Sequence, residues 1–219
     1  LLFNVLPLLA ILPLILLFSV GRGIDDMLEF MQSPEGGVAL LALVFIVGVV
    51  MTIFYGGLCV FMLALIRGQP VQSGMLYMGF RRAGALAGFA AFYVAGVMAG
   101  LMALVVPGII IAVGFCLTPF IIMESGLGTV AAMVASWKAV LKLDWWRVFV
   151  MFVALFLAFL GLVLVVEVIQ QILIAIVGAL PMAVLGLALE LGANIFVTII
   201  SGATFAAVYE QARRNNTSD

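Results

Sequence analysis

The chain has 219 residues, of which 67% are hydrophobic and 9% are charged, with a formal net charge of -1 and a mean hydropathy of +1.42. Soluble domains carry about 25% charged residues, and a chain this apolar would expose patches far above roughly a few hundred Å² in water. The composition therefore predicts an all-α, polytopic membrane protein and indicates no nucleic-acid partner.

The sequence contains no histidine, which removes the usual ligand of haem and of transition metals. We therefore expect no redox cofactor and no metal site. The two cysteines, Cys59 and Cys116, lie inside apolar runs and are interpreted as small packing residues.

Helices that cross a hydrocarbon core of about 30 Å need about 20 apolar residues. The first such segment lacks the basic start and the cleavage site of a signal peptide, so it is interpreted as a spanning helix. We predict one transmembrane domain, a six-helix bundle, with spans at 1–20, 38–66, 83–106, 107–123, 148–177 and 182–209.

The fourth span is the shortest and begins with Pro107-Gly108. This dipeptide fits a tight turn, and proline fits the first position of a helix. A helix from Pro107 to Glu124 would be about 27 Å long, barely enough to cross. We therefore predict a short hairpin with the preceding span, and a re-entrant pair of half-helices is the alternative reading.

Basic residues are distributed unevenly between the two sides of this bundle. Eight of the nine fall on the side of the turns after spans two and four and of the C-terminal tail, and they are Arg67, Arg81, Arg82, Lys138, Lys142, Arg147, Arg213 and Arg214. The positive-inside bias then predicts that both termini are cytoplasmic.

The stretch 124–147 is predicted to form a cytoplasmic, amphipathic interfacial helix. Apolar residues recur at helical spacing from Val130 to Leu141, and lysines beside them would meet anionic headgroups. The expected lipid-interface residues are Trp137, Lys138, Lys142, Trp145, Trp146 and Arg147. The helix either recognises lipid or only anchors the chain at the interface.

Small residues mark helix-packing faces inside the predicted bundle. In the third span they follow a small-xxx-small spacing that lets helix backbones approach closely, and they are Gly84, Gly88, Gly96 and Gly100. These faces serve either packing within the chain or docking of another membrane subunit.

Polar side chains interrupt the last two spans and form a candidate intramembrane polar site. Their i, i+3 and i+4 spacings place each group on one helical face, and the members are Glu167, Gln170, Gln171, Glu190 and Asn194. An ionised carboxylate at this depth costs at least about 2.5–3.5 kcal/mol, so we expect at least one acid to be neutral. The set is either a proton, cation or headgroup site or an interhelical hydrogen-bonded contact.

Two stretches carry a resemblance to known proteins. They are the order Pro107-Gly108, Pro119, Glu124 followed by Ser136-Trp137, and the turn GQPVQSGMLYMGFRR at 68–82. Together they resemble poorly characterised bacterial inner-membrane proteins of the YciC-like type and the membrane domain attached to some glycerophosphodiester phosphodiesterases. The resemblance implies a six-helix bundle in a bacterial inner membrane and no phosphodiesterase chemistry, which belongs to a separate soluble domain.

Three classes of function remain open at this stage. The favoured class is a non-enzymatic accessory or scaffolding protein that contacts membrane lipids or another membrane subunit. The second is a small transporter or channel that uses Glu167 and Glu190. An enzyme is disfavoured because the sequence shows no nucleophile–base pair, metal set or phosphate-binding loop.

Overall fold

The computed structural model describes residues 33–217 apart from 104 and 178, and these residues form seven α-helices and one 3-10 helix. The predicted all-α class is thus confirmed for this part of the chain, and the predicted first span, 1–20, lies outside it. In chain order the elements are α3 (Pro34–Ile66), η1 (Ser73–Arg82), α4 (Ala83–Ala103), α5 (Val105–Gly114), α6 (Thr118–Ser125), α7 (Thr129–Lys142), α8 (Trp145–Val177) and α9 (Ala179–Thr217).

Helix length and hydropathy identify a multi-pass membrane protein. Within the described residues, five stretches are long and apolar enough to cross a bilayer, and they are Phe45–Ile66, Ser73–Gly100, Val106–Ser125, Trp145–Leu173 and Gly192–Asn215. The last helix differs most from its predicted bounds, because α9 has 39 residues. At 1.5 Å per residue it is about 58 Å long, so it continues well beyond the predicted end of the span at residue 209.

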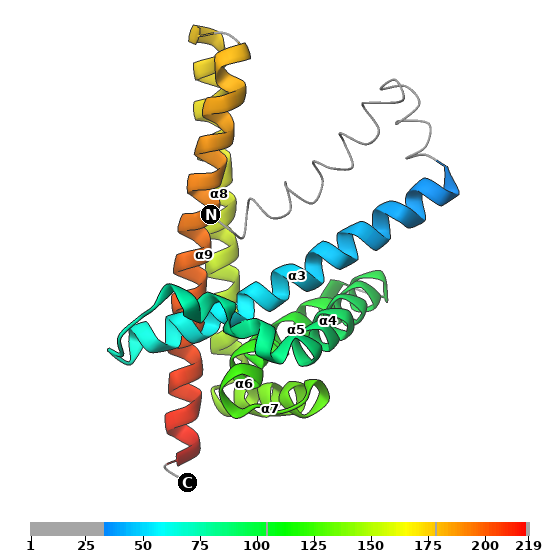
Figure 1. Cartoon of the computed structure of the whole chain (residues 1–219), viewed down its shortest axis with the longest axis vertical. Coiled ribbons are helices and arrows are strands. Elements are labelled where there is room, and N and C mark those ends of the chain that lie inside the picture. The colour runs from blue at the N-terminus through cyan, green and yellow to red at the C-terminus, as the bar shows by residue number, and fades with distance from the viewer. Residues whose placement is uncertain (1–32, 104, 178, 218–219) are drawn as a thin grey trace.

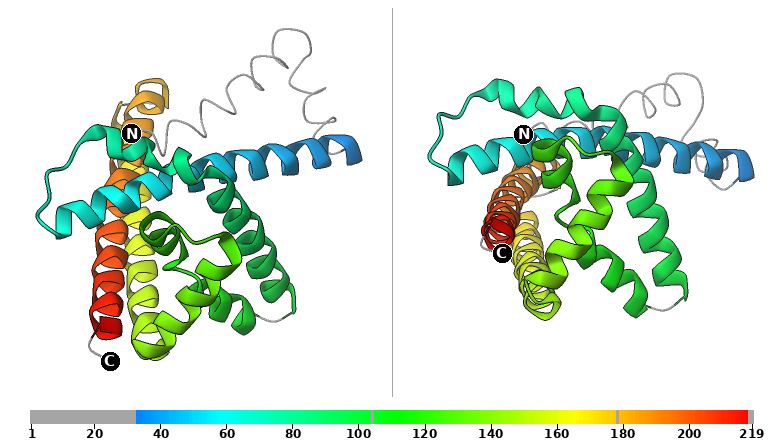
Figure 2. Two further views of the ribbon diagram at one scale, coloured as in Figure 1. Left: turned by 60° about the horizontal axis from the view of Figure 1, so that its bottom comes forward. Right: turned by 90° about the horizontal axis from the view of Figure 1, so that it is seen from below.

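The helices are arranged around one long hairpin. α8 and α9 run side by side and antiparallel, α3 crosses them obliquely, and α4 to α7 pack on one side of α3 (Figures 1 and 2). The core lies where α3, α4, α6, α7 and the C-terminal part of α9 meet. Its most deeply buried large side chains include Cys59, Leu86, Phe120, Ile122 and Val140.

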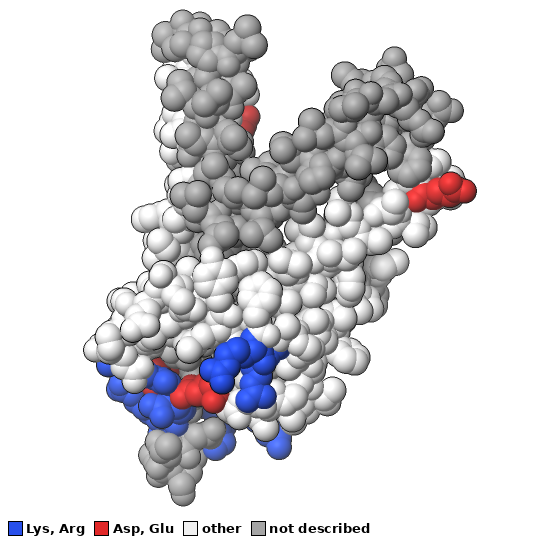
Figure 3. Space-filling view, in the orientation of Figure 1, with Lys and Arg blue, Asp and Glu red and all other residues white. Residues whose placement is uncertain are grey.

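Charge is segregated along the molecule. On the face seen in Figure 3, lysine and arginine side chains gather at the end near the C-terminus, and the described surface between that end and the start of α3 shows uncharged residues. The first turn of α3, at the opposite end, contains Glu35. We call the lysine- and arginine-rich end the basic end.

The predicted fourth span, 107–123, coincides with a stretch long and apolar enough to cross a bilayer, Val106–Ser125, but its helix is interrupted rather than continuous. α5 ends at Gly114, a turn occupies 115–117, and α6 begins at Thr118. The physical reason is Pro119, which has no amide hydrogen to donate into a continuing helix but fits the first turn of a new one. Pro107 and Gly108 instead lie in the first turn of α5, where a Cβ on Gly100 of α4 would come within 2.7 Å of the Gly108 Cα atom.

The segment after α3 also differs from the simple turn expected at 68–82. It contains the ten-residue 3-10 helix η1, which folds back along α3. Gly57 of α3 and Gly79 of η1 allow this packing, because a Cβ on Gly57 would collide with the Leu76 carbonyl and one on Gly79 with the Ile53 carbonyl. Two backbones in contact leave no room for any side chain at these positions.

Candidate functional site

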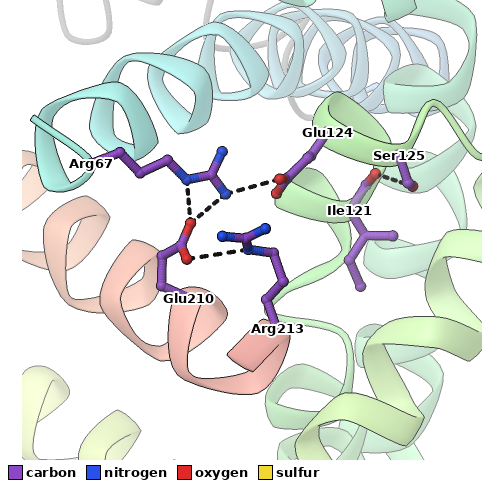
Figure 4. Close-up of polar contacts among 6 residues, drawn as sticks. All are labelled: Arg67, Ile121, Glu124, Ser125, Glu210 and Arg213. Carbon is purple, nitrogen blue, oxygen red and sulfur yellow. Dashed lines mark hydrogen bonds and ion pairs between the residues drawn. The ribbon is translucent and has the colours of Figure 1, made fainter. Parts of the chain in front are cut away.

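Four charged side chains meet at the basic end and form the ion-pair cluster, which consists of Arg67, Glu124, Glu210 and Arg213 (Figure 4). The Arg67 Nη2 atom lies 2.9 Å from Glu124 Oε1, and the same guanidinium also donates to the Glu210 carboxylate. The Arg213 Nε atom donates to the other oxygen of Glu210 at 3.2 Å.

Three separate elements supply these side chains. Arg67 is the residue after the last turn of α3, where its backbone N–H caps the helix by donating to carbonyl oxygens of α3. Glu124 lies in the last turn of α6, and Gly126 caps this helix with a φ of +69°. Glu210 and Arg213 are three residues apart on α9, so they share one face of that helix. The cluster therefore joins segments that lie 57 and 143 residues apart in sequence.

Burial differs strongly within the ion-pair cluster. The side chain of Glu210 is 7% exposed, whereas those of Arg67 and Glu124 are 25% and 27% exposed. A carboxylate with so little water needs paired cations, and the two arginines satisfy both of its oxygens. Burial lowers the pKa of Arg67, but hydrogen bonds to Glu124 and Glu210 outweigh it and hold the pKa above its ordinary value. Arg67 is therefore charged.

Aromatic rings lie next to the cluster on the side of the bundle interior. Phe120 of α6 stacks on Tyr209 of α9 with ring centroids 5.7 Å apart, and it meets Tyr55 of α3 edge-on at 6.4 Å. α3, α6 and α9 are thus connected twice, by aromatic contacts toward the bundle interior and by the ion-pair cluster at the basic end. Two cations and two anions balance each other, so the arrangement favours a structural connection over binding of a charged ligand.

The predicted polar site on the last two spans is partly assembled. Glu167, Gln170 and Asn194 line one cavity of about 180 Å³ between α8 and α9. The Gln171 amide donates to Glu167 at 3.0 Å along the same helix, and the Gln170 amide donates to the Gly186 carbonyl of α9 at 3.4 Å. Glu190 belongs to α9, but its side chain lies outside the part that the structure describes.

The predicted interfacial helix is α7, which is shorter than the stretch 124–147. Its outer face exposes Val130, Val134 and Leu141, and Trp146 follows at the start of α8 with 61% of its surface exposed. Its inner face is fixed to α5, because the buried Ser136 hydroxyl donates to the Gly114 carbonyl at 2.9 Å. The expectation that this face meets lipid remains a prediction.

The other residues of the predicted lipid interface differ in their surroundings: two tryptophans pack on aromatic rings, and two basic residues are exposed. Trp137 packs on Phe115 with ring centroids 5.7 Å apart, and Trp145 stacks on Phe149 at 5.2 Å. Lys138 is exposed. Arg147 lies 3.6 Å from Asp144, with both side chains largely in the open.

The four glycines of the third span have different surroundings. A Cβ on Gly88 would lie 2.7 Å from the Thr129 hydroxyl oxygen of α7, and Gly100 meets Gly108 as described above. A Cβ on Gly96 would make an ordinary contact with Ile111 at 3.6 Å, and one on Gly84 would have nothing within 4 Å. Close helix approach therefore occurs at Gly88 and Gly100.

Sequence reasoning did not find the ion-pair cluster. Arg67 and Arg213 were noted only as basic residues, Glu124 was noted as the end of the fourth span and as part of the resemblance, and Glu210 was not considered. One local signal was present: Glu210 precedes Arg213 by three residues on a helix. Its pairing with Arg67 has no local signature.

The chain matches no protein-family model, and comparison with curated proteins and with solved structures found no match either. The resemblance to the YciC-like and phosphodiesterase-linked membrane proteins therefore stays a prediction.

Proposed function

We propose that this multi-pass membrane protein is a non-enzymatic accessory or scaffolding component of a bacterial inner-membrane assembly, and that its α8–α9 hairpin contacts another integral membrane subunit. Both termini are proposed to be cytoplasmic, with the basic end on that side.

The observation that carries this proposal is the large exposed apolar surface of α8. Only 6% of its apolar stretch is buried, compared with 50% for Phe45–Ile66 of α3. A helix that is hydrophobic all round belongs inside a larger protein or in lipid. Packing within the described chain thus leaves most of α8 available for a neighbour.

Polar groups on the same hairpin favour a protein neighbour over lipid alone. Glu167 and Gln171 are exposed within an otherwise apolar stretch. Acids within a bilayer are costly and generally face a protein interior or a water-filled cavity. A partner helix that presents a hydrogen-bonding side chain would lower this cost. Gly161 on α8 would let the backbone of such a helix approach closely, because nothing in the described chain lies within 4 Å of a Cβ built there.

Site-specific photo-crosslinking in membranes tests the proposal. A photoreactive side chain at Val165 or Val168, which are 55% and 58% exposed on α8, is expected to yield one discrete protein adduct that Glu167→Leu weakens. The matched control is Phe92 on α4, also 58% exposed. Lipid adducts alone at both α8 positions would contradict the proposal.

A small transporter or channel is the alternative, and the cavity that contains Glu167, Gln170 and Asn194 favours it. In this alternative Glu167 and Glu190 would bind the transported proton or cation. Proton- or cation-coupled uptake into liposomes that disappears with Glu167→Gln or Glu190→Gln would support transport. Liposomes that show no uptake would leave the scaffolding proposal in place.

A further inference from the structure

A second cavity, of about 320 Å³, lies among α3, α4, α8, α9 and the start of α6. Its lining includes Tyr55 of α3, Tyr93 of α4, Cys116 and Pro119 at the helix interruption, Phe152 of α8 and Phe205 of α9. It is separate from the cavity between α8 and α9 that contains Glu167. No sequence motif pointed to it.

The chemistry of this lining selects an apolar ligand. None of the residues that line it is charged, and most are aromatic or aliphatic, with a few hydroxyls and one thiol. Small-molecule sites are typically about 300–1,000 Å³, mostly apolar, and found between helices of bundles. A cavity of this size suits one apolar chain, whereas a whole transmembrane helix is about 10–12 Å across.

The helix interruption borders the cavity and is the second observation that indicates a site. Cys116 lies in the turn between α5 and α6, and Pro119 lies in the first turn of α6. Broken backbone at membrane depth is tolerated where protein buries it or where it lines a cavity. Thr118, between them, has a fully buried hydroxyl with no hydrogen-bond partner in the described structure. Such an interruption costs stability, so a role in shaping the cavity accounts for it.

The surroundings of this cavity differ from one side to the other. Toward the basic end it is closed by the ring contacts of Tyr55, Phe120 and Tyr209 and then by the ion-pair cluster. Apart from Phe89 and Pro119, by contrast, the lining residues are only half-buried. We propose that the cavity binds a single acyl chain, from a phospholipid or a free fatty acid, which enters from the lipid phase. This proposal does not depend on the scaffolding function.

The test uses the full chain in nanodiscs with two photoreactive probes in separate arms, a phosphatidylcholine and a free fatty acid, each with a diazirine on the acyl chain. Labelled peptides are mapped by mass spectrometry. We expect saturable labelling of the segments around Tyr55, Tyr93 and Cys116 that excess unlabelled acyl chain competes away. The probe that labels identifies the source of the chain.

A pair of phenylalanine variants, one of which fills the cavity, provides the matched comparison. Thr52 lines the cavity and donates to the Gly48 carbonyl at 2.8 Å, whereas Thr204 on α9 makes the equivalent bond to Ile200 at 2.7 Å without lining it. Thr52→Phe should reduce the labelling severalfold, and Thr204→Phe should not.

Two results would overturn the proposal. One is labelling that rises in proportion to probe and covers the exposed face of α8 as strongly as the cavity. The other is equal labelling in the two variants. Should Thr52→Phe fail to fold, saturation and competition in the wild-type chain decide the question.

Discussion

Removal of Arg67 is the sharpest perturbation of the ion-pair cluster. Arg67→Ala leaves Glu210, whose side chain is 7% exposed, with Arg213 as its remaining partner in Figure 4. Hydrogen bonds to charged groups contribute about 1.5–3 kcal/mol, and the more exposed pair with Glu124 adds about 0–1 kcal/mol. We expect the free energy of unfolding to fall by about 1.5–4 kcal/mol in total.

Reversible unfolding of the purified protein in mixed detergent micelles, followed by intrinsic tryptophan fluorescence, measures this loss. Arg67→Lys keeps the charge but not the planar fork that contacts two carboxylates, so it should lose an intermediate amount. Arg81→Ala, at an exposed position on η1, serves as the control. If Arg67→Ala cost no more than Arg81→Ala, the cluster would not hold α3, α6 and α9 together.

Two further substitutions test close contacts elsewhere. Gly79→Ala places a methyl group against the Ile53 carbonyl and should destabilise the protein by about 1–3 kcal/mol or more in the same unfolding assay. The control, Gly84→Ala, has nothing within 4 Å of the added methyl group and should be neutral or slightly stabilising. Equal effects of the two substitutions would contradict the α3–η1 packing. Ser136→Ala removes the buried bond to the Gly114 carbonyl and should cost about 1–3 kcal/mol and raise protease sensitivity between α6 and α8, and unchanged digestion would argue against docking of α7 on α5.

Hydropathy was sufficient to predict the class and most helices. Apolar content over 20 or so residues is a local property, so α3, α4 and α8 were found with small errors at their ends. The predicted last span ended at residue 209, whereas α9 continues through polar and charged residues up to Thr217, because a helix does not need apolar side chains to continue.

The helix interruption at 115–117 was considered only as part of the alternative reading, a pair of half-helices. Pro119 was noted, yet apolar residues continue on both sides of it, and no hydropathy measure separates a broken helix from a continuous one. The 3-10 helix was missed for a related reason. Its contact with α3 depends on Gly57 and Gly79 facing each other, which only the folded chain shows.

Of the candidate functional residues, the polar groups on α8 were predicted from the sequence, and the ion-pair cluster was not. Glu167 and Gln170 were found because they stand out in an apolar helix, and the structure places them on one cavity with Asn194. Arg67 and Glu210 were not paired in advance because 143 residues separate them. Charged residues at the ends of spans are common, so composition alone does not indicate which of them meet.

The central claim is that the described helices cross a membrane with the basic end on one side. Single cysteines, introduced after Cys59 and Cys116 are replaced by alanine, test it in sealed vesicles with a membrane-impermeant thiol reagent. Gln72→Cys and Gln211→Cys, both at exposed positions near the basic end, are expected to react from the same side, and Glu35→Cys from the opposite side. Labelling of residues 72 and 211 from opposite sides, or of all three from one side, would contradict the account.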